Sequence, residues 1–223
     1  HKDYEFPDFA CYRPLFVGGK IASSLKSETF YRDNIGVNIA EKNSSFCELT
    51  GLYWAWQNGI FKNNQYVGLV HYRRYFAGKK LCLKKQHIAS ERELLSLLEK
   101  YEAILPKKRN YFIESIYSHY QHAHYVKDLN CTREIISELH PEYIISFDAI
   151  MQGRKIHIYN MFVMSSENAS EYCQWLFPIL FELEKRIDIT QYDNYQKRVF
   201  GFIAERLFNV WLVHHQLKFC EIP

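Results

Sequence analysis

Apolar residues recur with helical spacing over residues 43–59, which read NSSFCELTGLYWAWQNG. Ser45 and Glu48 match the S-x-x-E capping box at the start of many helices, and Gly59 suits the left-handed conformation that often ends one. The pattern therefore predicts one helix over this range.

The next segment, residues 65–76, reads QYVGLVHYRRYF and predicts a strand. Its first half is apolar, and Gly68 would allow another backbone to approach closely. The polar run HYRRY, residues 71–75, falls at its carboxyl end. Because side chains alternate along a strand, at most one of Arg73 and Arg74 would then face a given site.

The rest of the chain contains segments with helical spacing of apolar residues and segments with the alternation typical of strands. A second capping box, Ser90 with Glu93, opens a predicted helix over residues 90–101. The later predicted elements are a strand at 102–106, helices within 114–151 broken at Pro141, a strand at 155–164, a helix at about 167–186 kinked at Pro178, and a helix at about 193–215.

Strands and helices are mixed along the chain, and no repeat, low-complexity tract or Pro/Gly/Ser linker divides it. We therefore expect one domain over residues 1–223: an α/β fold with an open sheet and a helical C-terminal part. In such folds, ligands bind beyond the carboxyl ends of the strands.

Composition narrows the possible functions. The chain is 48% hydrophobic and 17% aromatic, as expected for a packed globule. A net charge of +3 is too small for a nucleic-acid-binding face, so no nucleic-acid partner is expected. Six scattered cysteines without a C-x-x-C pair indicate reduced thiols in a cytoplasmic protein. No apolar run is long enough to span a bilayer.

Two interpretations of HYRRY remain open on these grounds. It is either a solvated basic sheet edge with aromatic spacers, or a site where an arginine fork and His71 bind a diphosphate. The short pattern His119, His122, His124 can likewise be a metal site or a polar helix surface.

Two further segments place polar residues among apolar ones. Asn160 interrupts the predicted strand IYNMFVM, either as a satisfied core amide or as a ligand for sugar hydroxyls. Arg198 and Glu205 lie two turns apart on one face of the last helix, where Gly201 indicates close packing. That helix also carries an apolar stripe, which is either a core face or a membrane face: Phe200, Phe202, Leu207, Phe208, Val210 and Trp211.

The chain has no G-x-G-x-x-G, Walker, G-x-S-x-G or D-x-D motif.

Taken in order, several segments resemble a bacterial family first catalogued as a domain of unknown function, whose members are described as capsular and exopolysaccharide glycosyltransferases. The segments are HKDYEFPD, IGVNIAEKNSSFCELTGLYWAWQN, YVGLVHYRRYF, ILPKKRNYFIESIYSHYQHAHY, YNMFVM, YCQWLFPILFELEKRIDI and RVFGFIAERLFNVWL. In that family a strand precedes the first of them, so this chain is expected to lack its first strand.

The resemblance implies a GT-A-like, Rossmann-like transferase domain that uses a nucleotide sugar. In most such enzymes a D-x-D motif binds a divalent metal at a strand end. Here that strand end carries HYRRY, so we expect a guanidinium to stabilise the UDP leaving group in place of the metal. No cofactor is expected, with manganese or magnesium left open.

The resemblance also implies roles for individual residues. The expected uridine pocket consists of His1, Lys2, Asn38, Lys42 and Asn43. Arg73 or Arg74, with His71, would contact the diphosphate, Asn160 the donor sugar, and Arg198 the diphosphate or the acceptor. Glu205 is the first candidate for the catalytic base and Asp148 the second.

The implied reaction is transfer of a hexosyl group, galactofuranose or galactose first, from a UDP-sugar to a saccharide acceptor. The acceptor would belong to capsular polysaccharide, exopolysaccharide or O-antigen synthesis and would carry a lipid. Peripheral contact with the inner face of the cell membrane would follow. The alternatives are a non-catalytic carbohydrate-binding or scaffold protein and a metallohydrolase built on the histidines.

Overall fold

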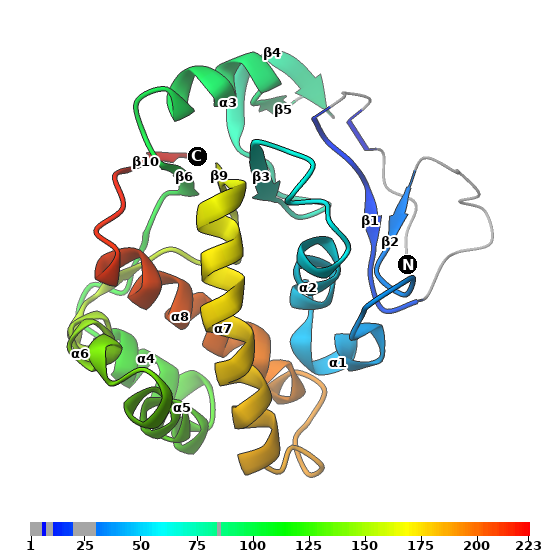
Figure 1. Cartoon of the computed structure of the whole chain (residues 1–223). Coiled ribbons are helices and arrows are strands. Elements are labelled where there is room, and N and C mark those ends of the chain that lie inside the picture. Colours follow the sequence, from blue (N-terminus) through cyan, green and yellow to red (C-terminus); the bar gives the residue numbers. More distant parts are fainter. Residues whose placement is uncertain (1–5, 8–10, 20–29, 84–85) are drawn as a thin grey trace.

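The computed structural model describes residues 6–7, 11–19, 30–83 and 86–223, and a mixed four-stranded sheet lies in the upper part of the molecule (Figure 1). The strand order is β10-β6-β9-β3. β6 runs parallel to β10, and β9 runs antiparallel to both β6 and β3. The bounds are β3 Tyr66–Leu69, β6 Ala103–Pro106, β9 Phe162–Ser165 and β10 Phe219–Ile222.

This pairing decides which chain segments meet at one edge of the sheet. Leu69 lies opposite Phe162, and Ile222 lies beside Pro106. The carboxyl ends of β3, β6 and β10 therefore share an edge with the amino end of β9. The HYRRY run follows β3 at this edge, as the sequence predicted.

Within the described part of the chain, three two-stranded ladders accompany this sheet. They are β1 Leu15–Phe16 with β2 Tyr31–Arg32, β4 Ala77–Leu83 with β5 Gln86–Ile88, and β7 Arg109–Asn110 with β8 Lys155–Ile156.

Most helices lie beside and below the sheet, and α3 lies above it (Figure 1). Those before β6 are η1 Ala40–Lys42, α1 Asn43–Phe46, α2 Leu49–Gln57 and α3 Glu91–Leu98. Those after it are α4 Ile116–Ala123, α5 Val126–Leu139, η2 Pro141–Tyr143, α6 Ile144–Gln152, α7 Ser166–Arg186, η3 Gln196–Arg198 and α8 Val199–His214. The expected α/β fold with a helical C-terminal part is confirmed.

The apolar stripe of α8 belongs to the core. Phe208 packs on Phe162 of β9 and on Tyr172 of α7, with ring centroids 5.6 and 5.1 Å apart. Trp211 is only 1% exposed. The stripe therefore stabilises the fold and does not form a membrane face. Within the described ranges, none of the helices combines the length and apolar character needed to cross a bilayer.

The helix expected over residues 43–59 is divided in two. Cys47 adopts φ 54°, so α1 ends before it and α2 begins at Leu49. The capping-box prediction was wrong here, because the Ser45 hydroxyl donates to the Lys42 carbonyl. The second capping box is confirmed: the Ser90 side chain accepts from the Glu93 amide, and the Glu93 carboxylate accepts from the Ser90 amide.

Neither of the two predicted strands that carry polar residues, 65–76 and 155–164, forms over its full range. β3 stops at Leu69, and His71 and Arg74 exchange two backbone hydrogen bonds of 3.1 and 3.0 Å across a tight turn. The strand predicted over 155–164 is split into β8 and β9. Strand alternation therefore cannot decide how Arg73 and Arg74 are directed.

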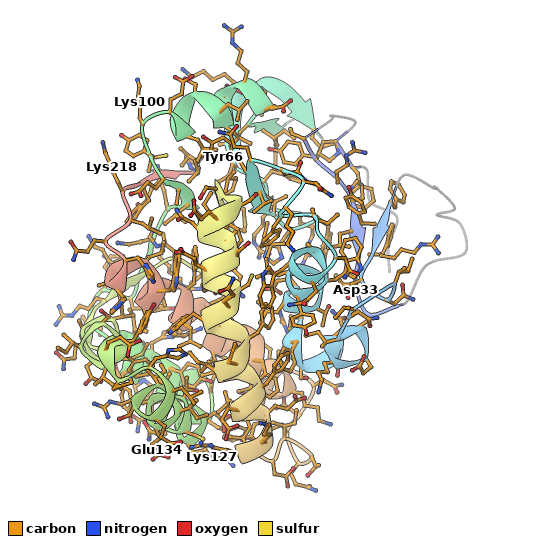
Figure 2. All side chains as sticks on the ribbon, in the orientation of Figure 1. Asp33, Tyr66, Lys100, Lys127, Glu134 and Lys218 are labelled. Carbon is orange, nitrogen blue, oxygen red and sulfur yellow. The ribbon has the colours of Figure 1, made fainter. Side chains whose placement is uncertain are left out.

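Buried Asp33 ties the β1–β2 ladder to α2, and Figure 2 shows it next to that helix. Its side chain is fully buried, and Oδ2 accepts from the Gly18 amide at 3.0 Å and from the Thr50 hydroxyl at 2.7 Å. A buried carboxylate with these donors is a strong local anchor.

Replacing that anchor should be costly for stability. Asp33→Ala leaves two donors without their acceptor and should lower the free energy of unfolding by about 3 kcal/mol. Urea denaturation measures the change. Exposed Asp188 accepts only locally, from the Thr190 amide, so Asp188→Ala is the control. Equal losses in the two variants would contradict the anchoring role of Asp33.

Candidate active site

The turn after β3 presents the HYRRY side chains at the sheet edge. Arg74 places its guanidinium carbon 4.1 Å from the ring centre of Tyr159, which lies just before β9. Arg73 lies over Tyr72 of its own turn, at 4.9 Å. Both arginines are exposed. The turn therefore directs Arg74 toward the β9 side of the edge and leaves Arg73 at its tip.

A second turn meets the first. Tyr159 and Asn160 both have positive φ, 76° and 51°, which is unusual for residues with a side chain. The Nε2 of His71 donates to the Tyr159 carbonyl at 2.5 Å. Left-handed backbone at two successive residues costs free energy and is commonly found at functional sites. Here it turns the chain sharply before β9, so Asn160 is not a strand residue.

Two carboxylates hold this second turn. Glu205 of α8 accepts from the Tyr159 amide at 2.8 Å. Glu48 accepts from the Asn160 side-chain amide at 2.7 Å, and the Gly201 carbonyl accepts from the same amide at 3.3 Å. Asn160 is 4% exposed, and its Oδ1 is buried without a hydrogen-bond partner. In this arrangement Asn160 orients Glu48.

Glu205 is largely enclosed. Its second oxygen lies 3.1 Å from Arg206, and its side chain is only 18% exposed. Burial raises the pKa of Glu205, and the neighbouring Arg206 guanidinium opposes that rise. Arg206 itself is buried, with its Nε unpaired. Both oxygens of Glu205 are therefore already occupied by donors.

Glu48 is a candidate site residue that the sequence interpretation missed, because its spacing from Ser45 placed it in a capping box. The break at Cys47 releases its side chain toward the sheet edge. Arg198 donates from Nε to the Cys47 sulfur at 3.3 Å, which brings η3 against the same break. Gly201 also packs there, because a Cβ on it would lie 3.3 Å from that sulfur. The close packing expected at Gly201 is confirmed.

A cleft of ≈ 520 Å³ runs along β3 to this group of residues. Among the described residues, β3 pairs with a neighbour on one side only, and the cleft occupies its other side. Apolar side chains of β3, α2 and α3 line most of its length; Figure 2 shows Tyr66 on β3. Its polar end holds Glu48, His71 and Tyr72. The lining also includes Arg13 and Glu91, so Glu48 and His71 are the charged or titratable residues at the end near the sheet edge.

The expected uridine-pocket residues have structural partners of their own. Lys42 forms an ion pair with Glu184 at 2.6 Å, and Asn43 donates to the Cys47 carbonyl at 2.7 Å. Asn38 donates to the Gly36 carbonyl at 2.8 Å. His1 and Lys2 lie outside the described residues.

Asp148 is not brought to this group. It lies on α6 and forms two hydrogen bonds of 2.7 Å with Arg133 of α5. Arg133 lowers the pKa of Asp148 through these hydrogen bonds. The pair lines a separate hollow of ≈ 530 Å³ over α4 to α6. A carboxylate that is already paired with a guanidinium is a poor proton acceptor.

The three histidines of the expected metal pattern have separate partners. His119 stacks on Tyr111, with ring centroids 3.7 Å apart, His122 pairs with Glu114, and His124 stacks on Phe202. Burial lowers the pKa of His124 to about 4, so its ring is neutral at pH 7. Within the described ranges, no group of three His, Cys, Asp or Glu side chains could hold a metal ion.

Together these contacts define a mixed α/β domain with a cationic turn and two carboxylates at one sheet edge, a combination suited to an anionic leaving group and proton transfer. Over residues 1–216 the chain matches the family described as "Domain of unknown function (DUF4422)", and it belongs to that family. No curated protein matches it.

Among solved structures, the chain is similar to WbbM, a bifunctional glycosyltransferase in its apo form. The identity is 32% and the TM-score 0.87; the match covers 100% of this chain and 43% of that one. The chain thus spans less than half the length of that protein.

Proposed function

We propose that this chain is a glycosyltransferase that moves a hexosyl group, galactofuranose or galactose first, from a UDP-sugar to a saccharide acceptor. The observation that carries the proposal is the Arg74 guanidinium at the sheet edge, which lies over Tyr159 of the neighbouring turn that Glu205 and Glu48 hold. The likeness of the whole chain to part of a bifunctional glycosyltransferase supports it.

In the proposed reaction, an acceptor hydroxyl attacks the anomeric carbon of the donor. The bond from that carbon to the diphosphate oxygen breaks, and UDP leaves with the electron pair. Arg74 and His71 stabilise the charge that develops on the diphosphate. A carboxylate takes the proton of the attacking hydroxyl. In this scheme a guanidinium fulfils the task that D-x-D enzymes give to a divalent cation.

For the base we assign Glu48, with Glu205 as the competing candidate. Glu48 lines the cleft, and among the described residues only Asn160 donates to it. Both oxygens of Glu205 already accept from donors of the protein, the Tyr159 amide and the Arg206 guanidinium. A base needs an accessible oxygen within hydrogen-bond reach of the acceptor, which favours Glu48.

The proposed donor position is the polar end of the cleft, with the diphosphate extending past His71 to Arg74, which is on the same turn but outside the cleft lining. The acceptor we propose is a lipid-linked saccharide of capsular polysaccharide, exopolysaccharide or O-antigen synthesis, used at the inner face of the cell membrane.

Calorimetric titration of UDP and UDP-galactofuranose, in EDTA and then in manganese, tests the donor site. We expect equal affinity in both buffers, because Arg74 needs no metal loading. Arg74→Ala should abolish binding. The control is Leu95→Ser, because Leu95 lines the apolar part of the cleft and is 42% exposed; this variant should leave binding unchanged.

Other results would contradict parts of this proposal. Binding only with manganese would overturn the metal-independent site, and loss of binding in Leu95→Ser would move the donor along β3. No binding in either buffer would instead favour a non-catalytic carbohydrate-binding or scaffold protein.

A further inference from the structure

The loop between β7 and α4 projects two large apolar side chains into solvent. Phe112 is 74% exposed and Ile113 is 88% exposed. Among the described large apolar residues, only Ile145, at 83%, is as exposed as this pair. Phe112 has φ 57°, a conformation that is costly for an aromatic residue. Strain that displays an apolar ring to water does not stabilise the fold, so it indicates a role for the displayed ring.

The loop is nevertheless well held at its base. The Tyr111 amide donates to the Arg154 carbonyl at 2.8 Å, and the Phe112 amide donates to Asn110 Oδ1 at 2.9 Å. The Glu114 amide closes the turn on the Tyr111 carbonyl at 3.2 Å. Phe112 and Ile113 therefore stand on a fixed base and do not hang from a loose segment.

Cations surround this base. Five exposed basic residues lie on the adjoining β7–β8 ladder and on the segments that lead into its two strands: Lys107, Lys108, Arg109, Arg154 and Lys155. None of the ion pairs found among the described residues involves any of them. The nearby acid Glu114 is paired with His122. This surface is therefore positive, and of its cations Lys108 and Arg109 lie over the rings of Phe219 and Tyr111.

We propose that residues 107–114, together with Arg154 and Lys155, form a tip that docks onto an anionic lipid surface. Phe112 and Ile113 insert at the level of the headgroups, and the five cations attract the lipid phosphates. A protein partner fits less well, since an apolar pair this exposed offers no groove or flat patch for complementary packing.

The position of the tip suits an enzyme that works on a lipid-linked substrate. The chain enters it from the carboxyl end of β6, at the sheet edge that carries the candidate site. Tyr111, at its base, is close enough to Arg206 and Glu205 for both to influence the pKa of its hydroxyl, which burial raises. The docking surface therefore borders the candidate site, although the docking inference does not depend on any activity.

Sedimentation with phosphatidylglycerol/phosphatidylcholine vesicles, compared with pure phosphatidylcholine, tests the docking. We expect the full chain to bind only the anionic vesicles. Phe112→Asn with Ile113→Ser should lower binding about tenfold, as should Lys107→Glu with Lys108→Glu. Asparagine tolerates the left-handed conformation at position 112, so the first variant should fold normally.

Matched controls exist in the same chain. Ile145→Ser removes an apolar side chain that is 83% exposed on α6, and Lys62→Glu with Lys100→Glu reverses two exposed lysines elsewhere. Both should leave vesicle binding unchanged. Failure of the unaltered chain to bind anionic vesicles, or equal losses in tip and control variants, would overturn the proposal. Because no turnover is measured, the outcome is independent of the proposed activity.

Discussion

Arg74→Ala should lower the turnover of a UDP-hexose about 100- to 1000-fold, because it removes the guanidinium proposed to stabilise the departing diphosphate. Arg73→Ala should be mild, since Arg73 lies at the tip of the turn over Tyr72 and does not reach the β9 side. UDP release, measured with a saccharide acceptor present, gives both values. Since both arginines are exposed, neither variant should lose much stability.

Arg74→Lys separates charge from geometry. Lysine retains the cation but lacks the planar fork that binds two diphosphate oxygens, so activity should recover only in part. Equal, mild losses in Arg73→Ala and Arg74→Ala would refute the diphosphate assignment. A larger loss in Arg73→Ala would mean that the donor lies on the outer side of the turn.

Glu48→Gln should abolish most turnover and leave UDP affinity and stability nearly unchanged. The amide cannot take the acceptor proton, but its oxygen can still accept from Asn160. Glu205→Gln should behave differently, because it leaves the buried guanidinium of Arg206 without its anion. Breaking a buried pair in this way costs about 3–5 kcal/mol, so thermal unfolding should show a clear loss of stability.

The pH dependence of kcat/KM distinguishes the two carboxylates. Burial raises the pKa of Glu205, so a mechanism that used it as base would lose activity on acidification at a higher pH than an ordinary glutamate requires. If Glu48 is the base, Glu205→Gln leaves the acidic limb of the profile in place. A limb that disappears in Glu205→Gln and persists in Glu48→Gln would reverse the assignment.

Local signals in the sequence were sufficient where neighbouring residues complete the interaction. The Ser90 and Glu93 cap forms as predicted, because both partners lie within one turn of helix. Gly59 has φ +80° just beyond α2, as its place at the helix end predicted. The polar run after the apolar half of 65–76 was likewise placed at a strand end, because the change from apolar to polar residues marks where the half-buried strand β3 stops.

The predictions from the sequence were wrong where a long-range partner competes with a local pattern. Ser45 and Glu48 have capping-box spacing, but Glu48 instead accepts from Asn160, 112 residues away in the chain. Asp148 was a free candidate in the sequence, but Arg133 of the preceding helix neutralises it. Neither partner can be read from periodicity, because each depends on how helices and sheet pack.

By itself the sequence determined the fold class, the order of most helices and strands, and the presence of a cationic run where a strand ends. Only the tertiary structure decided which arginine of HYRRY meets Tyr159, that Glu48 joins Asn160, and that the apolar stripe of α8 is core. The physical reason is that helix and strand periodicity arises from neighbours along the chain, whereas the site arises from two turns and a helix break that packing brings together.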